Sequence, residues 1–248
     1  MSGVALAWQQ FRFERKLFWR NPSAAFFNFV LPLLLLVLTA SAFSADQEEL
    51  EVLIPGIAAM GVLATTFTSL AFNITILRDE GVLKRWRGTP MPAGSYLAGL
   101  LASAAMNAFA QVLIVVTIGN LVYGVDWPQD PALLILFTAL GVVCFAALGI
   151  AFSHAIPNED AAPAYTNAVF LPVIFISGVF YSTDDLPEVL NAIAEALPLK
   201  HLIDGLSGAM VTGTGLADNA AALGVLGLWT VLGVFLAIRG FSWDARRG

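Results

Sequence analysis

The sequence predicts an all-α protein that crosses a membrane several times. Of its 248 residues, 58% are hydrophobic and only 12% are charged, and the apolar residues gather in long blocks. This charged fraction is about half that of a typical soluble domain. The blocks are close to the length of about 20 residues that a helix needs to cross about 30 Å of hydrocarbon. We therefore expect a single helical membrane domain over residues 1–248.

Six transmembrane helices are predicted, and none has Lys, Arg, Asp or Glu well inside it. They are Ser23–Phe43, Leu53–Leu77, Tyr96–Tyr123, Ala132–Ile156, Ala162–Tyr181 and Ala217–Ile238. Pro32 and Pro172 fall within the first and fifth of these, where a proline kinks a membrane helix rather than ending it. The first could instead be a cleaved signal peptide, but its apolar stretch and the charged segment before it are both too long for one.

The basic residues set the predicted orientation. Eleven of the 12 Lys and Arg residues lie in the N-terminal segment, in the loop after the second predicted span or in the C-terminal tail. Lys and Arg are retained in cytoplasmic loops, so both termini are predicted to be cytoplasmic. Only Lys200 lies in a segment that the span count places outside. No basic stripe with interleaved aromatic residues is present, so nucleic acid is not an expected partner.

Residues 1–22 are predicted to form a helix that lies along the cytoplasmic membrane surface. Its apolar stripe is Val4, Trp8, Phe11 and Phe18, and its neighbouring cationic stripe is Arg12, Lys16 and Arg20. Such a helix places aromatic rings at the acyl boundary and cations among the lipid headgroups. A soluble cytoplasmic helix is the alternative interpretation of the same pattern.

The segment 182–215 is too long for a tight turn and too polar to span the membrane. Its apolar residues recur at the spacing of one helix face: Leu186, Val189, Leu190, Ile193 and Leu197. Pro198 ends this helix, and Leu199–Met210 is predicted to form a second. We expect an extracellular re-entrant hairpin of two short helices that enters the outer leaflet. An ordinary folded surface loop is the alternative.

The sequence contains no recognisable catalytic constellation. The lysines Lys16, Lys84 and Lys200 are followed by Leu, Arg and His, so none completes the Gly-Lys-Ser/Thr ending of a P-loop. The two histidines, His154 and His201, are predicted on opposite sides of the membrane, which argues against a metal site. We expect this chain not to be an enzyme and to bind no cofactor itself.

The polar residues inside the predicted spans are neutral. A charge at the centre of a membrane helix costs about 2.5–3.5 kcal/mol, and ion-driven carriers accept that cost at their ion site. Here the spans offer neutral polar groups, and the amides Asn73, Asn107, Gln111 and Asn167 are the candidates for a substrate pathway. They could equally serve as hydrogen-bonding groups between helices. Without a carboxylate well inside any span, the energy for transport is expected to come from another subunit.

Two stretches resemble the ABC-2 class of ABC transporter permeases. The first is residues 77–90, LRDEGVLKRWRGTP, which is similar to the family's first cytoplasmic loop, where an acidic-Gly pair precedes a basic helix and a Thr-Pro. The second is residues 176–181, ISGVFY, which continues through Leu186-Pro187 to Leu197-Pro198-Leu199. It resembles the end of the family's fifth span and the following hairpin, although Tyr181-Ser182 stands where a proline often follows.

The resemblance implies a specific machine. Two six-span permeases pair, as a homodimer or with a paralogue, and two cytoplasmic P-loop ATPase subunits bind ATP and Mg beneath them. Residues 78–93 would form the coupling loop, seated in a groove of the ATPase through Glu80, Val82, Leu83, Lys84, Arg85, Trp86 and Arg87. Apolar anchors such as Trp86 and complementary charges such as Arg85 and Arg87 suit such an interface.

We therefore expect the membrane-spanning subunit of an ATP-driven exporter in a bacterial plasma membrane. Its cargo would be an amphipathic drug, an antibiotic or a lipid-like molecule. The resemblance implies drug or antibiotic export, and apolar spans with neutral amides tolerate many amphipaths. Two alternatives stay open at this point: an ATP-independent secondary carrier and a non-transporting membrane scaffold.

Overall fold

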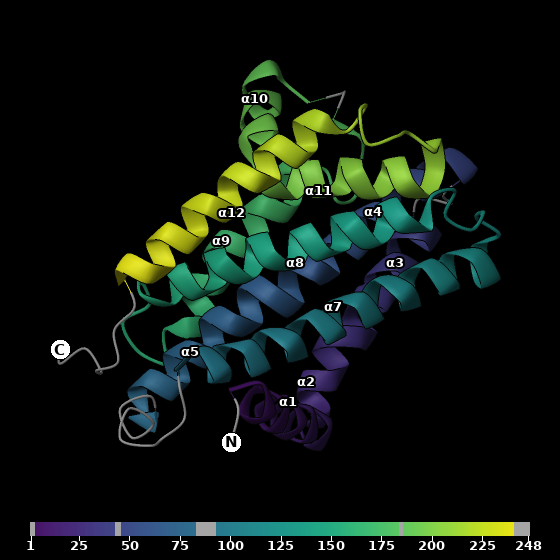
Figure 1. Cartoon of the computed structure of the whole chain (residues 1–248). Helices are drawn as coiled ribbons and strands as arrows, with labels where there is room; N and C mark the ends of the chain where they lie inside the picture. The colour runs from purple at the N-terminus through teal and green to yellow at the C-terminus, as the bar shows by residue number, and fades with distance from the viewer. Residues whose placement is uncertain (1–2, 43–45, 83–92, 184–185, 241–248) are drawn as a thin grey trace.

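A computed structural model describes residues 3–42, 46–82, 93–183 and 186–240, and every regular element in these ranges is a helix (Figure 1). The predicted all-α class is thereby confirmed for the described part of the chain. The α-helices are α1 Gly3–Arg20, α2 Pro22–Ala25, α3 Leu31–Ala42, α4 Gln47–Leu63, α5 Ser69–Asp79, α7 Ala93–Tyr123, α8 Pro131–Ser153, α9 Ala162–Ile176, α10 Glu188–Ala196, α11 Pro198–Ser207 and α12 Ala220–Gly240. Single π-helical turns occur at η1 Phe26–Val30, η2 Ala64–Thr68 and η4 Gly208–Thr212.

Four described helices are long and apolar enough to cross a membrane. They are Gln47–Asp79, Gly94–Tyr123, Pro131–Ser153 and Ala220–Gly240, which correspond to the second, third, fourth and sixth predicted spans. Two shorter apolar helices, Phe26–Ala42 and Ala162–Ile176, occupy the first and fifth positions. At 1.5 Å per residue they are about 26 and 22 Å long. The chain is thus a multi-pass membrane protein, and the full count of six spans stays a prediction.

The second predicted span is longer than expected because its helix begins outside the apolar block. Asp46 caps it, and the Asp46 carboxylate accepts a hydrogen bond of 3.0 Å from the backbone N–H of Glu49. Glu48 and Glu49 in the first turn lie near the positive end of the helix dipole, which favours acidic groups. The start predicted from apolar content was Leu53. The acidic residues up to Glu51 mark the edge of the hydrocarbon, but the helix begins before them, at Gln47.

Pro32 is accommodated by the π-helical turn η1 immediately before it. In this turn the backbone N–H of Leu31 bonds to the carbonyl of Phe26, five residues back. A proline removes one backbone donor and clashes with the carbonyl four residues earlier. A wider turn is one of the known responses of a helix to such an interruption. The predicted irregularity at this site therefore takes the form of a π-helical turn.

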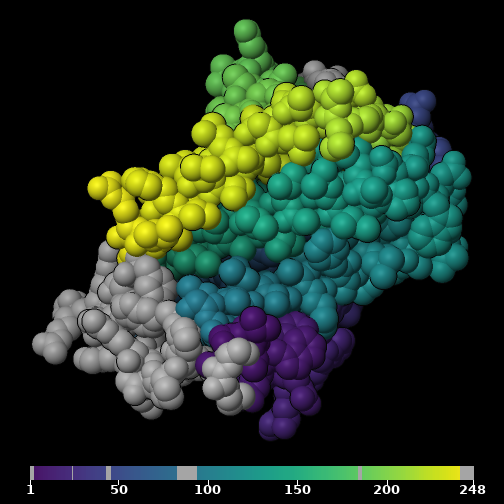
Figure 2. All heavy atoms as spheres, in the orientation of Figure 1, coloured from purple at the N-terminus to yellow at the C-terminus, as the bar shows by residue number. Residues whose placement is uncertain are grey.

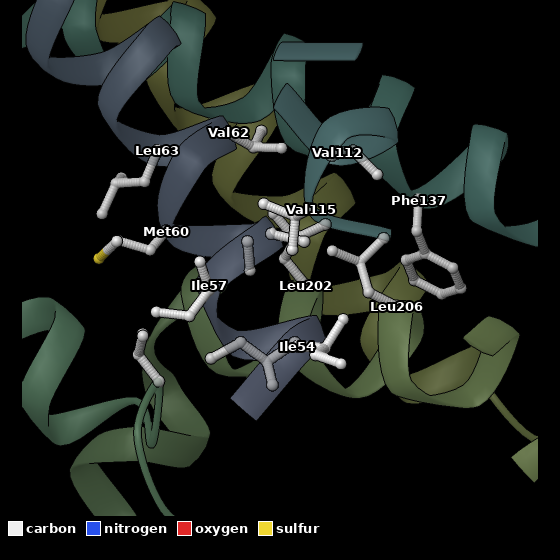
Figure 3. Close-up of a cluster of buried hydrophobic side chains, with 14 of the residues drawn as sticks. Ile54, Ile57, Met60, Val62, Leu63, Val112, Val115, Phe137, Leu202 and Leu206 are labelled. Carbon is white, nitrogen blue, oxygen red and sulfur yellow. The ribbon is translucent and has the colours of Figure 1, made fainter. Parts of the chain in front are cut away.

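The centre of the molecule is α4, which forms the first part of the second span. Side chains from α4 meet residues of α7, α8 and α11 in one continuous apolar cluster, in which Ile57, Val115, Phe137, Leu202 and Leu206 are wholly buried (Figure 3). In contrast, α12 packs along α8 at the periphery and exposes most of its apolar side chains, as its place on the surface in Figure 2 shows. The α12 face is therefore available to lipid or to another subunit.

The segment after α9 forms the two short helices that its sequence predicts. In α11, the side chains of Leu199, Leu202 and Leu206 are fully buried among α4, α8 and α12. In α10, Val189 is 71% exposed and Ile193 is 43% exposed, so the apolar face of this helix points away from the chain's own core. Insertion of this hairpin into the outer leaflet stays a prediction.

Candidate functional site

The predicted coupling residues lie at the end of α5 and beyond it. Leu83, Lys84, Arg85, Trp86 and Arg87 fall outside the described residues. Glu80 is exposed, and its backbone N–H bonds to the carbonyl of Ile76 at 2.9 Å. Gly81 follows in the left-handed region, with φ of 68°, which ends the helix in the way that C-terminal glycines commonly do. The acidic-Gly pair of the sequence motif is thus a helix stop, with Val82 half-buried after it.

Two residues in the last turn of α5 hold the connection between α8 and α9. The Arg78 guanidinium donates to the carbonyl of Ser153 at 2.9 Å and to that of Ile156 at 2.7 Å. Asp79 lies beside it, and its carboxylate accepts a hydrogen bond of 2.6 Å from the backbone N–H of Glu159. From the sequence, Arg78 was predicted to lie in the cytoplasmic coupling loop, as one of its basic residues. No spacing pattern reveals its contacts with Ser153 and Ile156, because they join residues about 80 positions apart.

A polar cavity of about 300 Å³ opens between α1, η1, the η2–α5 segment and α7. Its polar lining consists of Glu14, Asn21, Asn28, Thr65, Ser69, Asn73, Ser103 and Asn107. Its apolar lining consists of Leu17, Phe18, Leu70, Phe72, Leu100 and Ala104. Hydroxyl and carboxamide groups therefore face aromatic and aliphatic side chains across one small space, which is the mixture that ligand pockets commonly present.

Helix periodicity explains why these polar groups meet. Thr65, Ser69 and Asn73 are spaced by four residues along the η2–α5 segment, and Ser103 and Asn107 are spaced by four along α7. Residues four apart lie on one face of a helix, and the two segments run antiparallel beside each other (Figure 1). The polar stripes therefore face one another, and α1 covers the groove between them.

The predicted pathway amides are only partly brought together. Asn73 and Asn107 line the cavity, and Arg15 donates a hydrogen bond to the Asn107 side-chain oxygen. Asn167 lies exposed on α9, away from the cavity. Gln111, one turn beyond Asn107, is fully buried against Gly61, where an added Cβ would lie 2.4 Å from the Gln111 Cγ. Its side-chain nitrogen and oxygen find no partner among the described residues.

The sequence-based prediction did not include Glu14, Thr65, Ser69 and Ser103, because it rested on the amides within the spans. The four-residue spacing of Thr65, Ser69 and Asn73 was the available signal. Glu14 could not be found this way, since it reaches the cavity from α1, which the sequence places outside the membrane. Among the described residues, no group of three or more His, Cys, Asp and Glu side chains could hold a metal ion.

Burial raises the pKa of the Glu14 carboxyl above 4.5, and a hydrogen bond of 2.6 Å from Gln10 opposes this shift. Because the pKa is higher in the folded state than in the unfolded state, the folded protein loses stability as the pH rises from the unfolded-state pKa through the folded-state pKa. Below the unfolded-state pKa there is no such loss. Glu14→Gln is therefore expected to raise the melting temperature of the detergent-solubilised protein at neutral pH and to leave it unchanged at about pH 4. A scanning-fluorimetry series over pH measures this. Equal gains at both pH values would contradict the ionisation account.

A family model described as "ABC-2 type transporter" matches residues 4–211. Nodulation protein J of Neorhizobium galegae is 28% identical over 185 residues, which cover 73% of this chain and 69% of that protein. The linearmycin resistance permease protein LnrN of Bacillus subtilis (strain 168) is 24% identical over 183 residues, covering 73% of this chain and 46% of that protein.

A third relative is the probable multidrug ABC transporter permease YbhS of Escherichia coli (strain K12). It is 22% identical over 164 residues, which cover 65% of this chain and 43% of that protein. The matched part thus amounts to less than half the length of LnrN and of YbhS, but to more than two thirds of the nodulation protein. The family match includes α1, the polar cavity and both helices of the hairpin.

Proposed function

This chain belongs to the ABC-2 type transporter family and is the membrane subunit of an ABC exporter, and we propose that it moves an amphipathic molecule outward with ATP hydrolysed on a separate subunit. The observation that supports the cargo class is the small cavity in which amides and hydroxyls face apolar side chains. A molecule with a polar end and an apolar body satisfies both walls. A purely apolar cargo would displace water from the polar wall without replacing its hydrogen bonds, which costs free energy.

The names of the relatives agree with this cargo class. LnrN is named for resistance to linearmycin and YbhS for multidrug transport. We propose a drug, an antibiotic or a lipid-like molecule as the cargo, and a bacterial plasma membrane as its location, with both termini in the cytoplasm. The hairpin of α10 and α11 would be re-entrant and would cover the outer end of the pathway.

The energy is proposed to enter through the segment that follows α5. A P-loop ATPase of separate sequence would bind the coupling loop beyond the buried Arg78, with Glu80, Val82 and the basic and aromatic residues up to Arg87 at the contact. A second permease, either a copy of this chain or a paralogue, would complete the pathway. Closure of the ATPases on ATP would shift the permease between two arrangements, because a ligand changes an equilibrium only through its different affinity for the two states.

The test is a mild-detergent purification of the tagged chain from its native membranes, followed by mass spectrometry. We expect a P-loop ATPase of separate sequence in comparable amount, and ATP-dependent movement of a fluorescent amphipath into inverted vesicles. Dissipating the ion gradients with an ionophore should leave that movement unchanged. Movement that needs the gradient but not ATP would establish a carrier instead, and a bound partner without any movement would establish a scaffold.

Asn107→Leu tests the cavity directly. The side chain is buried, receives a hydrogen bond from Arg15 and lines the polar wall. Leucine keeps the space filled but removes the amide that a polar group of the cargo would bind, and loss of such a hydrogen bond costs about 0.5–1.5 kcal/mol. We expect ATP-dependent uptake into inverted vesicles to fall by up to about tenfold.

The control for this variant is Asn167→Leu, which changes the same residue type on the exposed surface of α9. Its uptake should stay at the wild-type level, and both variants should retain their ATPase. If Asn167→Leu lowers uptake as much as Asn107→Leu does, or if neither variant changes uptake, the polar cavity is not part of the substrate pathway.

A further inference from the structure

Arg78 is the one Lys, Arg, Asp or Glu side chain buried within the part of the chain that the structure describes, with an exposed fraction of 2%. Burying a charge is costly unless it is paired and hydrogen-bonded. Arg78 meets this requirement through the carbonyls of Ser153 and Ile156 and through Asp79, whose carboxylate lies 3.4 Å from its Nε. Ser153 is the last residue of α8, where backbone carbonyls lack partners within the helix.

Asp79 extends the contact to the next helix. Its carboxylate accepts the hydrogen bond from the backbone N–H of Glu159, and the carbonyl of Glu159 in turn accepts from the N–H of Ala162 at 3.2 Å. Ala162 is the first residue of α9. One unbroken series of hydrogen bonds thus joins the last turn of α5 to the first turn of α9.

Apolar packing at the same place makes the contact rigid. The side chains of Ala71, Ile156 and Ala162 are fully buried against each other, with Phe72 and Phe152 packed around them. The three residues come from α5, from the α8–α9 connection and from α9. Close-packed interiors transmit displacement rather than absorbing it. A displacement of the α5 end therefore has no soft element between it and α9.

We propose that Arg78 and Asp79 are positioning residues that transmit movement of the segment after α5 to α9, so that the second and fifth spans respond to the ATPase together. This inference rests on the proposed function, because it takes the segment after Asp79 as the place where the ATPase acts. The loop between α8 and α9 has no Lys or Arg of its own. Movement of the ATPase would therefore reach this loop through α5.

The test compares Arg78→Lys, Arg78→Gln and Asp79→Asn in vesicles that contain the whole transporter with its ATPase. Lysine keeps the charge but lacks the planar fork that reaches two carbonyls at once. Arg78→Gln is expected to keep ATPase binding and ATP hydrolysis, while molecules transported per ATP fall about tenfold, which lies within the usual range of coupling between sites. Transport per ATP in Arg78→Lys should lie between the values for the wild type and for Arg78→Gln. Asp79→Asn retains an acceptor for the Glu159 N–H, so its transport per ATP should fall less than that of Arg78→Gln.

Arg239→Gln is the matched control, since Arg239 is an exposed arginine at the end of α12. It should leave transport per ATP unchanged. In a double variant of Arg78→Gln with Asp79→Asn, the fold-decrease in transport per ATP should be smaller than the product of the two single fold-decreases. The effects of residues that act as one unit are not additive.

Three outcomes would overturn the proposal. Transport per ATP could stay at the wild-type level in Arg78→Gln, the ATPase could fail to bind that variant, or uptake could fall only in proportion to lost folded protein. If Arg78→Gln does not fold, Asp79→Asn and Arg78→Lys decide by the same ratio. Failure of the proposed function would look different, since the wild-type protein itself would then show no ATP-driven transport.

Discussion

Replacing Gly56 with valine is expected to prevent the stable packing of α4 against the segment after α9. A Cβ at Gly56 would lie 2.0 Å from the carbonyl oxygen of Val179 and 2.8 Å from its carbonyl carbon. These are main-chain atoms, so no side-chain rotation relieves the contact. Val179 is itself fully buried, and it follows Gly178, whose φ of +75° only glycine adopts easily. The two segments must separate.

We expect Gly56→Val to lower the melting temperature in detergent by about 5–10 °C, given about 1–3 kcal/mol or more for overpacking in a chain of this length. Gly224→Val is the control, because no atom lies within 4 Å of a Cβ at that position in α12. Its melting temperature should equal that of the wild type. A wild-type melting temperature for Gly56→Val would show that α4 does not pack on the Val179 backbone in the membrane.

Reversing the charges of Arg85 and Arg87, together with Trp86→Ala, is expected to abolish ATP-driven transport. All three side chains follow the helix stop at Gly81, in the loop that the positive-inside rule places in the cytoplasm. Aromatic and arginine side chains dominate the binding energy of many interfaces. Like charges placed against each other cost several kcal/mol. The ATPase should no longer co-purify, while the amount of folded permease in the membrane stays the same.

Arg239→Glu provides the control, since it reverses an exposed arginine at the end of α12 and leaves the loop intact. Its ATPase content should match that of the wild type. Normal binding and normal transport by the triple variant would exclude residues 85–87 from the interface. Loss of the ATPase in both variants would show that total cytoplasmic charge, rather than this loop, governs the association.

Most of the fold could be predicted from the sequence, because apolar length and charge placement decide it. The helices around residues 47–79, 94–123, 131–153 and 220–240 and the two short helices after Pro187 lie where the pattern indicated. Helix starts were less accurate, as at Gln47, since a capped helix extends beyond the hydrocarbon. The π-helical turn at Ala64–Thr68 leaves no mark in hydropathy, because all five residues are compatible with an ordinary helix.

The candidate site was predictable only in part. Asn73 and Asn107 were found because amides in apolar spans are unusual, and the cavity brings them together. Asn167 was chosen on the same ground, yet it faces outward on α9. Which face of a helix turns inward depends on its neighbours rather than on its own residues. The Arg78 contacts with Ser153 and Ile156 depend on three-dimensional proximity, which cannot be read from a single sequence.

The π-helical turn η2 also determines which length changes this span tolerates in evolution. A turn that closes from residue i to residue i+5 holds one residue more than an α-helical turn. Removing a single residue within 64–68 would convert it to regular α-helix and keep both flanking halves in their present rotation, so that Gly61 would still meet α7 and Asn73 would still face the cavity. A deletion elsewhere in α4 or α5 would turn everything beyond it by about 100°. Homologous chains that are one residue shorter in this span are expected to have their gap here.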